Sequence, residues 1–116
     1  MQLEIRKYLF DIRESIISIE DYLGPSRNFE VYQKNKMLRR AVERELEIIG
    51  EATNRLLKVY PDFPISEARR IVNLRNLVIH GYDIVDSIII WGIITKDIPA
   101  LKIRIGELLN DNNPEK

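Results

Sequence analysis

The sequence predicts an all-α protein, an antiparallel bundle of four to five helices whose last helix is kinked by a proline. Apolar residues recur at steps of three and four over long stretches, and short segments rich in glycine or proline separate these stretches. No stretch alternates apolar and polar residues as a half-buried strand would. At 116 residues the chain has the length of one domain. We expect the domain to cover residues 1–110 and a polar tail to follow over residues 111–116.

The first predicted helix covers Leu3 to Leu23. Its apolar residues form one stripe along the helix: Ile5, Tyr8, Leu9, Ile12, Ile16, Ile19 and Leu23. Gly24 and Pro25 end the helix, and a short turn is expected around Phe29 to Tyr32.

The second predicted helix is long and runs from about Asn35 to Val59. Its buried face is expected to carry Leu38, Ala41, Val42, Ile49, Ala52 and Leu56. Pro61 and Pro64 end it, because proline cannot donate to the hydrogen bonds of a helix.

Two further helices are expected in the second half of the chain. Ser66 is a candidate start for the third, and Gly81 directly after His80 is a candidate left-handed end. Asp86 is the expected cap of the last helix, which continues to about Leu109. Pro99 interrupts the hydrogen bonds inside that helix, so a kink is expected there.

Composition excludes several classes of protein and site. The chain has no cysteine, so disulfides, zinc–thiolate sites and thiol catalysis are excluded. Its longest uncharged run, Ser87 to Thr95, is too short to span a bilayer, and charged residues begin at Glu4, so we expect a cytoplasmic protein. Basic and acidic residues number 18 each, which denies the chain the broad positive field of a strong nonspecific nucleic-acid binder.

The only histidine, His80, follows Arg75 by five residues and precedes Tyr82 by two. Histidine can exchange a proton near neutral pH, and arginine is a permanent planar cation suited to phosphate. In RNA the 2′-hydroxyl is itself a nucleophile, so a protein needs only to move protons and stabilise the phosphorane. His80 and Arg75 suit these two tasks, and the sequence shows no cluster of side chains at metal-ligand spacing, so we expect neither a metal nor another cofactor.

Two charged residues fall on helix faces that are otherwise apolar. At about 100° per residue, Arg75 lies within the core stripe of its helix and Glu45 within that of the second helix. Because an unpaired inward charge is costly, we expect Glu45 to lie within hydrogen-bonding reach of Arg75. This pair is either a purely structural ion pair or a support that orients the guanidinium toward a phosphate.

Leu74, Leu77 and Val78 point away from the core stripe and make the third helix apolar on nearly all sides. A helix of this kind is expected to be covered on its second side by another subunit. We therefore expect a homodimer formed through this helix.

The segment Arg75–Tyr82 resembles the signature of the HepT-like toxins, a branch of the HEPN ribonuclease superfamily. The upstream segment Leu46–Ala52 and the downstream segment Ile90–Pro99 are similar to that family as well, and the resemblance extends to about Leu109. It implies an HEPN-like helical bundle and a homodimeric, metal-independent endoribonuclease. In that family the catalytic pair would be Arg75 and His80, with Asn76 as the accompanying polar residue.

The resemblance also implies a protein partner. HepT-like toxins are neutralised by a minimal, MntA-like nucleotidyltransferase antitoxin that transfers AMP from ATP to the tyrosine of the signature, which corresponds to Tyr82 here. A catalytically silent bundle that only docks such a partner is the alternative, favoured by the neutral net charge. A plain structural bundle is a third possibility.

The spacing of the signature raises a geometric condition. Positions five apart on a regular helix lie about 140° from each other around the axis. Arg75 and His80 of one subunit therefore face a common point only if the helix ends near His80, or if a two-fold axis brings the second subunit's residues alongside.

Overall fold

The computed structural model describes residues 2–25, 27–78 and 83–111, and over these residues it is helical without a β-strand. The elements are α1 (Leu3–Leu23), α2 (Phe29–Lys34), α3 (Lys36–Val59), α4 (Ser66–Arg75), α5 (Asp83–Gly92), the π-helical turn η1 (Ile93–Asp97) and α6 (Ile98–Asp111). The predicted all-α class is confirmed. The expected tail at residues 112–116 lies outside the described residues.

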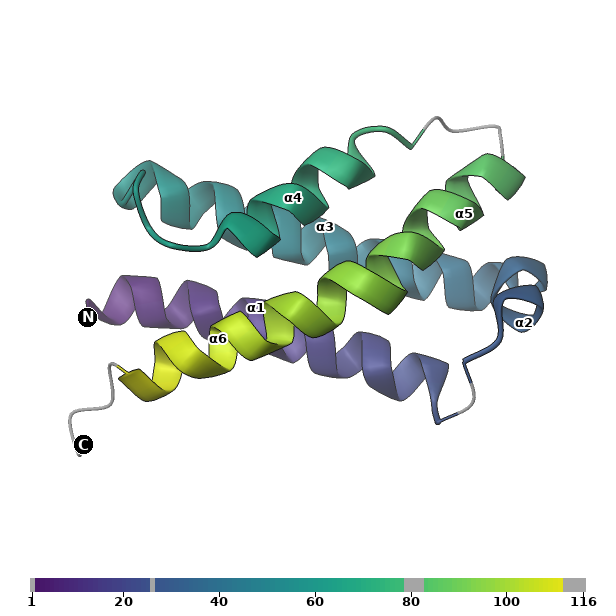
Figure 1. Cartoon of the computed structure of the whole chain (residues 1–116), viewed down its shortest axis with the longest axis horizontal. Helices are drawn as coiled ribbons and strands as arrows, with labels where there is room; N and C mark the ends of the chain where they lie inside the picture. Colours follow the sequence, from purple (N-terminus) through teal and green to yellow (C-terminus); the bar gives the residue numbers. More distant parts are fainter. Residues whose placement is uncertain (1, 26, 79–82, 112–116) are drawn as a thin grey trace.

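Two long helices, α1 and α3, lie side by side and form the base of the bundle (Figure 1). Helix α1 has the predicted bounds, and it ends at Gly24, whose φ of 69° is a left-handed conformation that favours glycine. Asn35 caps α3 by accepting a hydrogen bond from the Leu38 backbone N–H at 3.0 Å. The bundle is elongated, 45 × 28 × 19 Å, because the 24 residues of α3 alone span about 36 Å.

The segment expected to be a short turn around Phe29 to Tyr32 is instead a helix of six residues, α2. Asn28 caps it through a hydrogen bond from the Val31 N–H. The fully buried Tyr32 and its neighbour Phe29 pack their rings against Trp91 of α5, with centroids 5.4 and 5.8 Å away. Burial raises the pKa of the Tyr32 hydroxyl. Helix α2 thus packs against α5 through these aromatic rings.

The last long helix is interrupted in its middle by η1. There the Ile98 N–H bonds the Ile93 carbonyl, one residue further back than in an α-helix, and Pro99 follows in the first turn of α6. The break therefore comes just before Pro99, the expected position. In a regular α-helix the proline ring would clash with the carbonyl of the residue four positions earlier, and that residue lies in η1. The expected cap at Asp86 was wrong: α5 already begins at Asp83, so Asp86 lies inside the helix.

The core runs the length of the bundle and is built mainly of isoleucine and leucine, including Ile65 from the connection between α3 and α4. Its least exposed members are Leu9, Ile12, Ile16, Ile19, Val42, Ile49, Leu56, Ala68, Ile93, Ile94, Leu101 and Ile105. Within the described part of the chain, no helix is long and apolar enough to cross a membrane. Helices α4 and α5 pack against this core, and in Figure 1 the end of α4 and the start of α5 both lie on the upper side of the molecule, apart from each other.

Candidate active site at the end of helix α4

Helix α4 carries Arg75 as its last residue, and it ends earlier than expected. The Leu77 N–H bonds the Leu74 carbonyl and the Val78 N–H bonds the Arg75 carbonyl, each at 3.0 Å, so the helix tightens into turns of three residues. The predicted extension to His80 was therefore wrong, since the α-helix stops five residues before it. The angle expected for a regular helix between positions 75 and 80 no longer applies.

Ile79, His80, Gly81 and Tyr82 lie outside the described residues, and so does the predicted left-handed end at Gly81. The start of α4 agrees with the expectation, since Ser66 is the first residue of the helix. Ile65 occupies the cap position and makes no side-chain cap hydrogen bond.

Arg75 is half-buried, with 32% of its side chain exposed, and its Nη2 lies 3.4 Å from Oε1 of Glu47 on α3. The other oxygen of that carboxylate, Oε2, accepts a hydrogen bond from Arg44 at 3.1 Å. One carboxylate is thus shared by two guanidinium groups. An ion pair this exposed adds at most about 1 kcal/mol to stability, so its main effect is to restrict the orientation of the Arg75 side chain.

The prediction that Glu45 is the partner of Arg75 was wrong. Glu45 accepts a hydrogen bond from the Tyr22 hydroxyl of α1 at 2.9 Å, and this bond raises the pKa of Tyr22. Two residues along a helix turn the side chain by about 200°, so Glu45 faces α1 while Glu47 faces α4.

The structure shows why Glu47 and not Glu45 meets α4. A Cβ at Gly50 would lie in ordinary van der Waals contact, 3.9 Å, with Cγ2 of Val72 on α4, so this face of α3 is the one that packs against α4. Glu47 precedes Gly50 by three residues and therefore shares its face of the helix.

Asn76 follows Arg75 directly, with helical backbone angles and an exposed side chain. Leu77 is 60% exposed, whereas Leu74 and Val78 are half-buried against the core. Three further aliphatic residues on α5, which the sequence pattern did not single out, are at least half exposed: Ile84, Val85 and Ile88. We refer to Leu77, Ile84, Val85 and Ile88 as the aliphatic end of the molecule.

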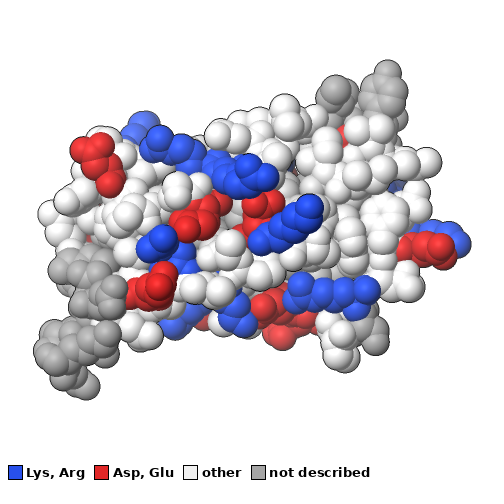
Figure 2. Space-filling view, viewed as in Figure 1, with Lys and Arg blue, Asp and Glu red and all other residues white. Residues whose placement is uncertain are grey.

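Ion pairs hold α4 in place on the rest of the bundle. Nε of Arg70 lies 2.8 Å from the largely buried carboxylate of Asp97 in η1, and Arg104 of α6 lies 3.3 Å from Glu67. On the face of the molecule seen in Figure 2, basic and acidic groups are interspersed, as the neutral net charge suggests. In the described part of the chain, no cluster of three or more His, Cys, Asp or Glu side chains could hold a metal ion.

Comparison with known proteins identifies one family. The profile of the family described as Ribonuclease HepT-like matches residues 12–108, which include Arg75, Asn76, His80 and Tyr82. No solved structure matches the chain.

Several relatives are similar to this chain over nearly their whole length. A protein named probable ribonuclease HepT from Thermococcus cleftensis is 36% identical over 93% of this chain and 98% of its own length. A protein of Methanocaldococcus jannaschii, provisionally named as an RNase, is 36% identical over 85% of this chain and 91% of its own. Another provisionally named RNase, from Caldanaerobacter subterraneus, is 39% identical over 90% and 93% of the two chains.

Proposed function

Because the chain belongs to the HepT-like ribonuclease family, we propose that it is a metal-independent endoribonuclease whose chemistry lies in the segment 75–82. The observation that carries the proposal is the position of Arg75. This arginine ends α4 inside the matched region, and the Glu47 carboxylate on the neighbouring helix restricts its side chain.

The proposed reaction uses the 2′-hydroxyl of RNA as the nucleophile. His80 takes the proton of that hydroxyl while the 2′-oxygen bonds to the adjacent phosphorus, and the bond from phosphorus to the 5′-oxygen breaks. The leaving oxygen takes up a proton, so the products are a 2′,3′-cyclic phosphate and a 5′-hydroxyl. Arg75 stabilises the additional negative charge on the phosphorane, and Asn76 supplies a neighbouring hydrogen-bonding group.

A homodimer is part of this proposal. The aliphatic end leaves four large apolar side chains in water, one of them, Leu77, two residues after Arg75, and a second copy of the chain would cover them. A two-fold axis there would place the Arg75 and His80 residues of both subunits around one cleft.

Control of the activity is proposed to act through Tyr82. The tyrosine oxygen would attack the α-phosphorus of ATP on a nucleotidyltransferase antitoxin, so that AMP becomes attached and pyrophosphate leaves. The bulky anionic group would then lie two residues from His80, where it would exclude RNA and pair with Arg75.

The ribonuclease proposal is tested with purified protein and a labelled RNA in the presence of EDTA. We expect cleavage that EDTA does not diminish, products that end in 2′,3′-cyclic phosphate, and no cleavage at a nucleotide that carries 2′-deoxyribose. Cleavage that EDTA abolishes would show that a metal site performs the reaction instead.

The neutral charge gives specific support to a second function, a catalytically silent bundle that docks the nucleotidyltransferase. Absence of RNA cleavage together with a stable complex of the two proteins would establish this alternative.

Modification of Tyr82 is tested by co-expression with the neighbouring nucleotidyltransferase and intact-mass spectrometry. The expected result is a mass increase of one or more AMP units in the wild type and none in Tyr82→Phe. Neutralisation of an unmodified wild-type protein would instead indicate simple occlusion of the cleft.

A further inference from the structure

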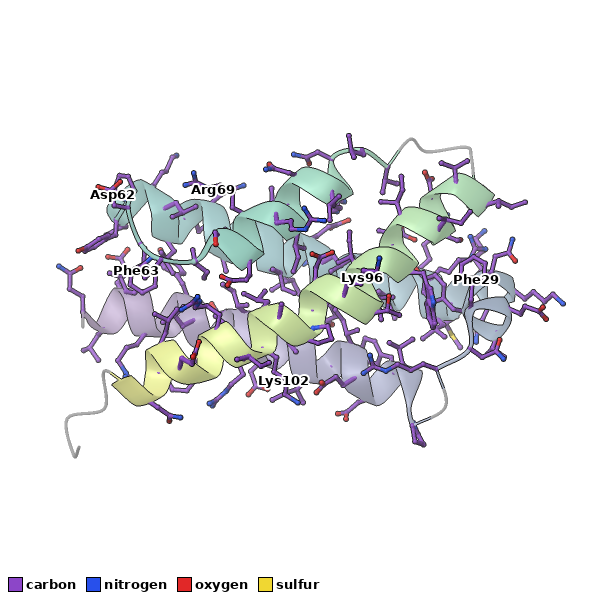
Figure 3. The ribbon with its side chains drawn as sticks, viewed as in Figure 1. Phe29, Asp62, Phe63, Arg69, Lys96 and Lys102 are labelled. Carbon is purple, nitrogen blue, oxygen red and sulfur yellow. The ribbon has the colours of Figure 1, made fainter. Side chains whose placement is uncertain are left out.

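A groove between α3 and α4 lies close to the candidate active site but was not part of the sequence-based prediction. It encloses about 390 Å³, and its walls are formed by Thr53, Asn54, Leu57, Lys58, Arg69, Val72 and Asn73. Figure 3 labels Arg69 on the edge of α4 that is turned away from α6. No aspartate or glutamate lines this groove among the described residues.

Within the described part of the chain, no acidic side chain neutralises the charge of this groove. Lys58 and Arg69 are exposed and form no ion pair with another described residue. The groove on the opposite side of Arg69 differs, because Arg70 is paired there with Asp97 and Glu67 with Arg104. An anionic ligand would therefore find two unpaired cations on the α3 side only.

The uncharged lining residues suit a nucleotide. The amides of Asn54 and Asn73 can both donate and accept hydrogen bonds, as the edges of bases require. Leu57 and Val72 are half-buried and give the groove an apolar floor against which a ribose or base can pack. The Thr53 hydroxyl is already committed, since it donates to the Ile49 carbonyl at 2.7 Å.

The groove also points toward the candidate active site. Arg69, Asn73 and Asn76 are spaced by four and three residues, so they form one polar line along α4 that ends beside Arg75. Arg69 and Arg75 lie about 9 Å apart along the axis of α4 and about 120° apart around it, so a strand that contacts both must wrap over the end of the helix.

We propose that the groove of Lys58, Asn54, Arg69 and Asn73 binds single-stranded RNA on one side of the phosphate to be cleaved. This inference rests on the proposed ribonuclease function for its location, but binding can be measured separately from cleavage. It also resolves how a chain of zero net charge could hold RNA, because capture would depend on a local pair of unpaired cations rather than on a general positive field.

The test measures binding of a fluorescent 2′-O-methyl RNA of about twelve nucleotides to the full chain by anisotropy, since this RNA lacks the nucleophile and stays intact. Lys58→Ala and Arg69→Ala should each weaken binding about three- to tenfold, and each should reduce the slope of log K against log salt by about 0.7. Arg55→Ala is the matched control. Arg55 is an exposed cation of α3 that lies outside the groove and pairs with no acidic side chain of residues 2–25, 27–78 or 84–110, and its loss should change binding less than twofold.

Equal weakening by Arg55→Ala, or unchanged binding by the double variant Lys58→Ala/Arg69→Ala, would overturn the proposal. Competition by an acidic peptide as effective as unlabelled RNA would assign the groove to a protein ligand instead. Groove-dependent binding by a chain that never cleaves RNA would support this inference while refuting the proposed function. Cleavage by a chain whose double variant binds RNA as well as the wild type does would support the proposed function and refute this inference.

Discussion

The α1–α3 pair and the aliphatic end both carry large aliphatic side chains, but the first set is buried and the second is exposed to solvent. Along α1 and α3, residues such as Ile16 and Ile49 are completely buried. At the aliphatic end, Leu77 and Ile84 are each 60% exposed. The buried set stabilises the fold, whereas the exposed set is available to a second molecule.

The charged residues show the same contrast. Glu45 joins α1 to α3 through Tyr22, which is a link within the scaffold. Glu47, two residues later, restrains Arg75 at the end of α4. Two carboxylates of one helix therefore act in different parts of the molecule. A substitution of Glu45 should affect the scaffold, and a substitution of Glu47 should affect the candidate active site.

The largest effect is expected from Ile49→Ala in the scaffold. Removing this fully buried side chain leaves a cavity, so the free energy of unfolding should fall by about 2–5 kcal/mol in urea denaturation. Ile103→Ala is the control, because Ile103 is 67% exposed on α6 and should lower stability by less than about 0.5 kcal/mol. Equal losses in the two variants would contradict the assignment of the core.

Leu77→Asp should have the next largest effect, on association rather than on folding. A charge in the aliphatic end would weaken a homodimer about ten- to a hundredfold, because the carboxylate would be buried without a partner. Sedimentation at micromolar concentration should show the wild type as a dimer and the variant as a monomer. A wild-type monomer, or a dimer that Leu77→Asp leaves intact, would refute the composite cleft.

Glu47→Gln should lower RNA cleavage about tenfold by releasing Arg75 from its charged partner. Glu45→Gln is a matched change on the same helix and should alter cleavage less than twofold, because its contact is with Tyr22. Steady-state rates of the two variants decide between these roles. A larger loss in Glu45→Gln would restore the partner that the sequence suggested.

The smallest effect is expected from Arg70→Ala, which removes the exposed partner of Asp97. Because 66% of the Arg70 side chain is in solvent, the free energy of unfolding should fall by only about 1 kcal/mol or less. Thermal denaturation at low and high salt would check this, since the difference from wild type should shrink as salt screens the pair. A loss that salt does not reduce would show that Arg70 acts through packing.

The regular apolar pattern of the sequence predicted the bounds of the two long helices correctly. The stripe of apolar residues and the stop at Gly24 located α1, and the apolar pattern that begins at about Asn35 located α3. The six residues of α2 were missed because so short a helix has no clear periodicity and depends on packing against Trp91.

The candidate site was less predictable, since it depends on where a helix stops. The count of 100° per residue placed Arg75 on the inward stripe of its helix, yet α4 ends at Arg75 and leaves its side chain half-buried. Choosing between Glu45 and Glu47 required knowing which face of α3 meets α4. That information lies in the packing at Gly50 and Val72 and not in the apolar pattern.

The most direct test of the proposed division between scaffold and active site measures RNA cleavage and thermal denaturation together for His80→Ala and Arg75→Ala. We expect each variant to lose cleavage by at least about a hundredfold. The melting temperature of each variant should stay within about 3 °C of the wild type. For Arg75→Ala the reason is that the Arg75 side chain is only half-buried and is not part of the hydrophobic core. Undiminished cleavage by purified His80→Ala would show that the activity does not belong to this segment.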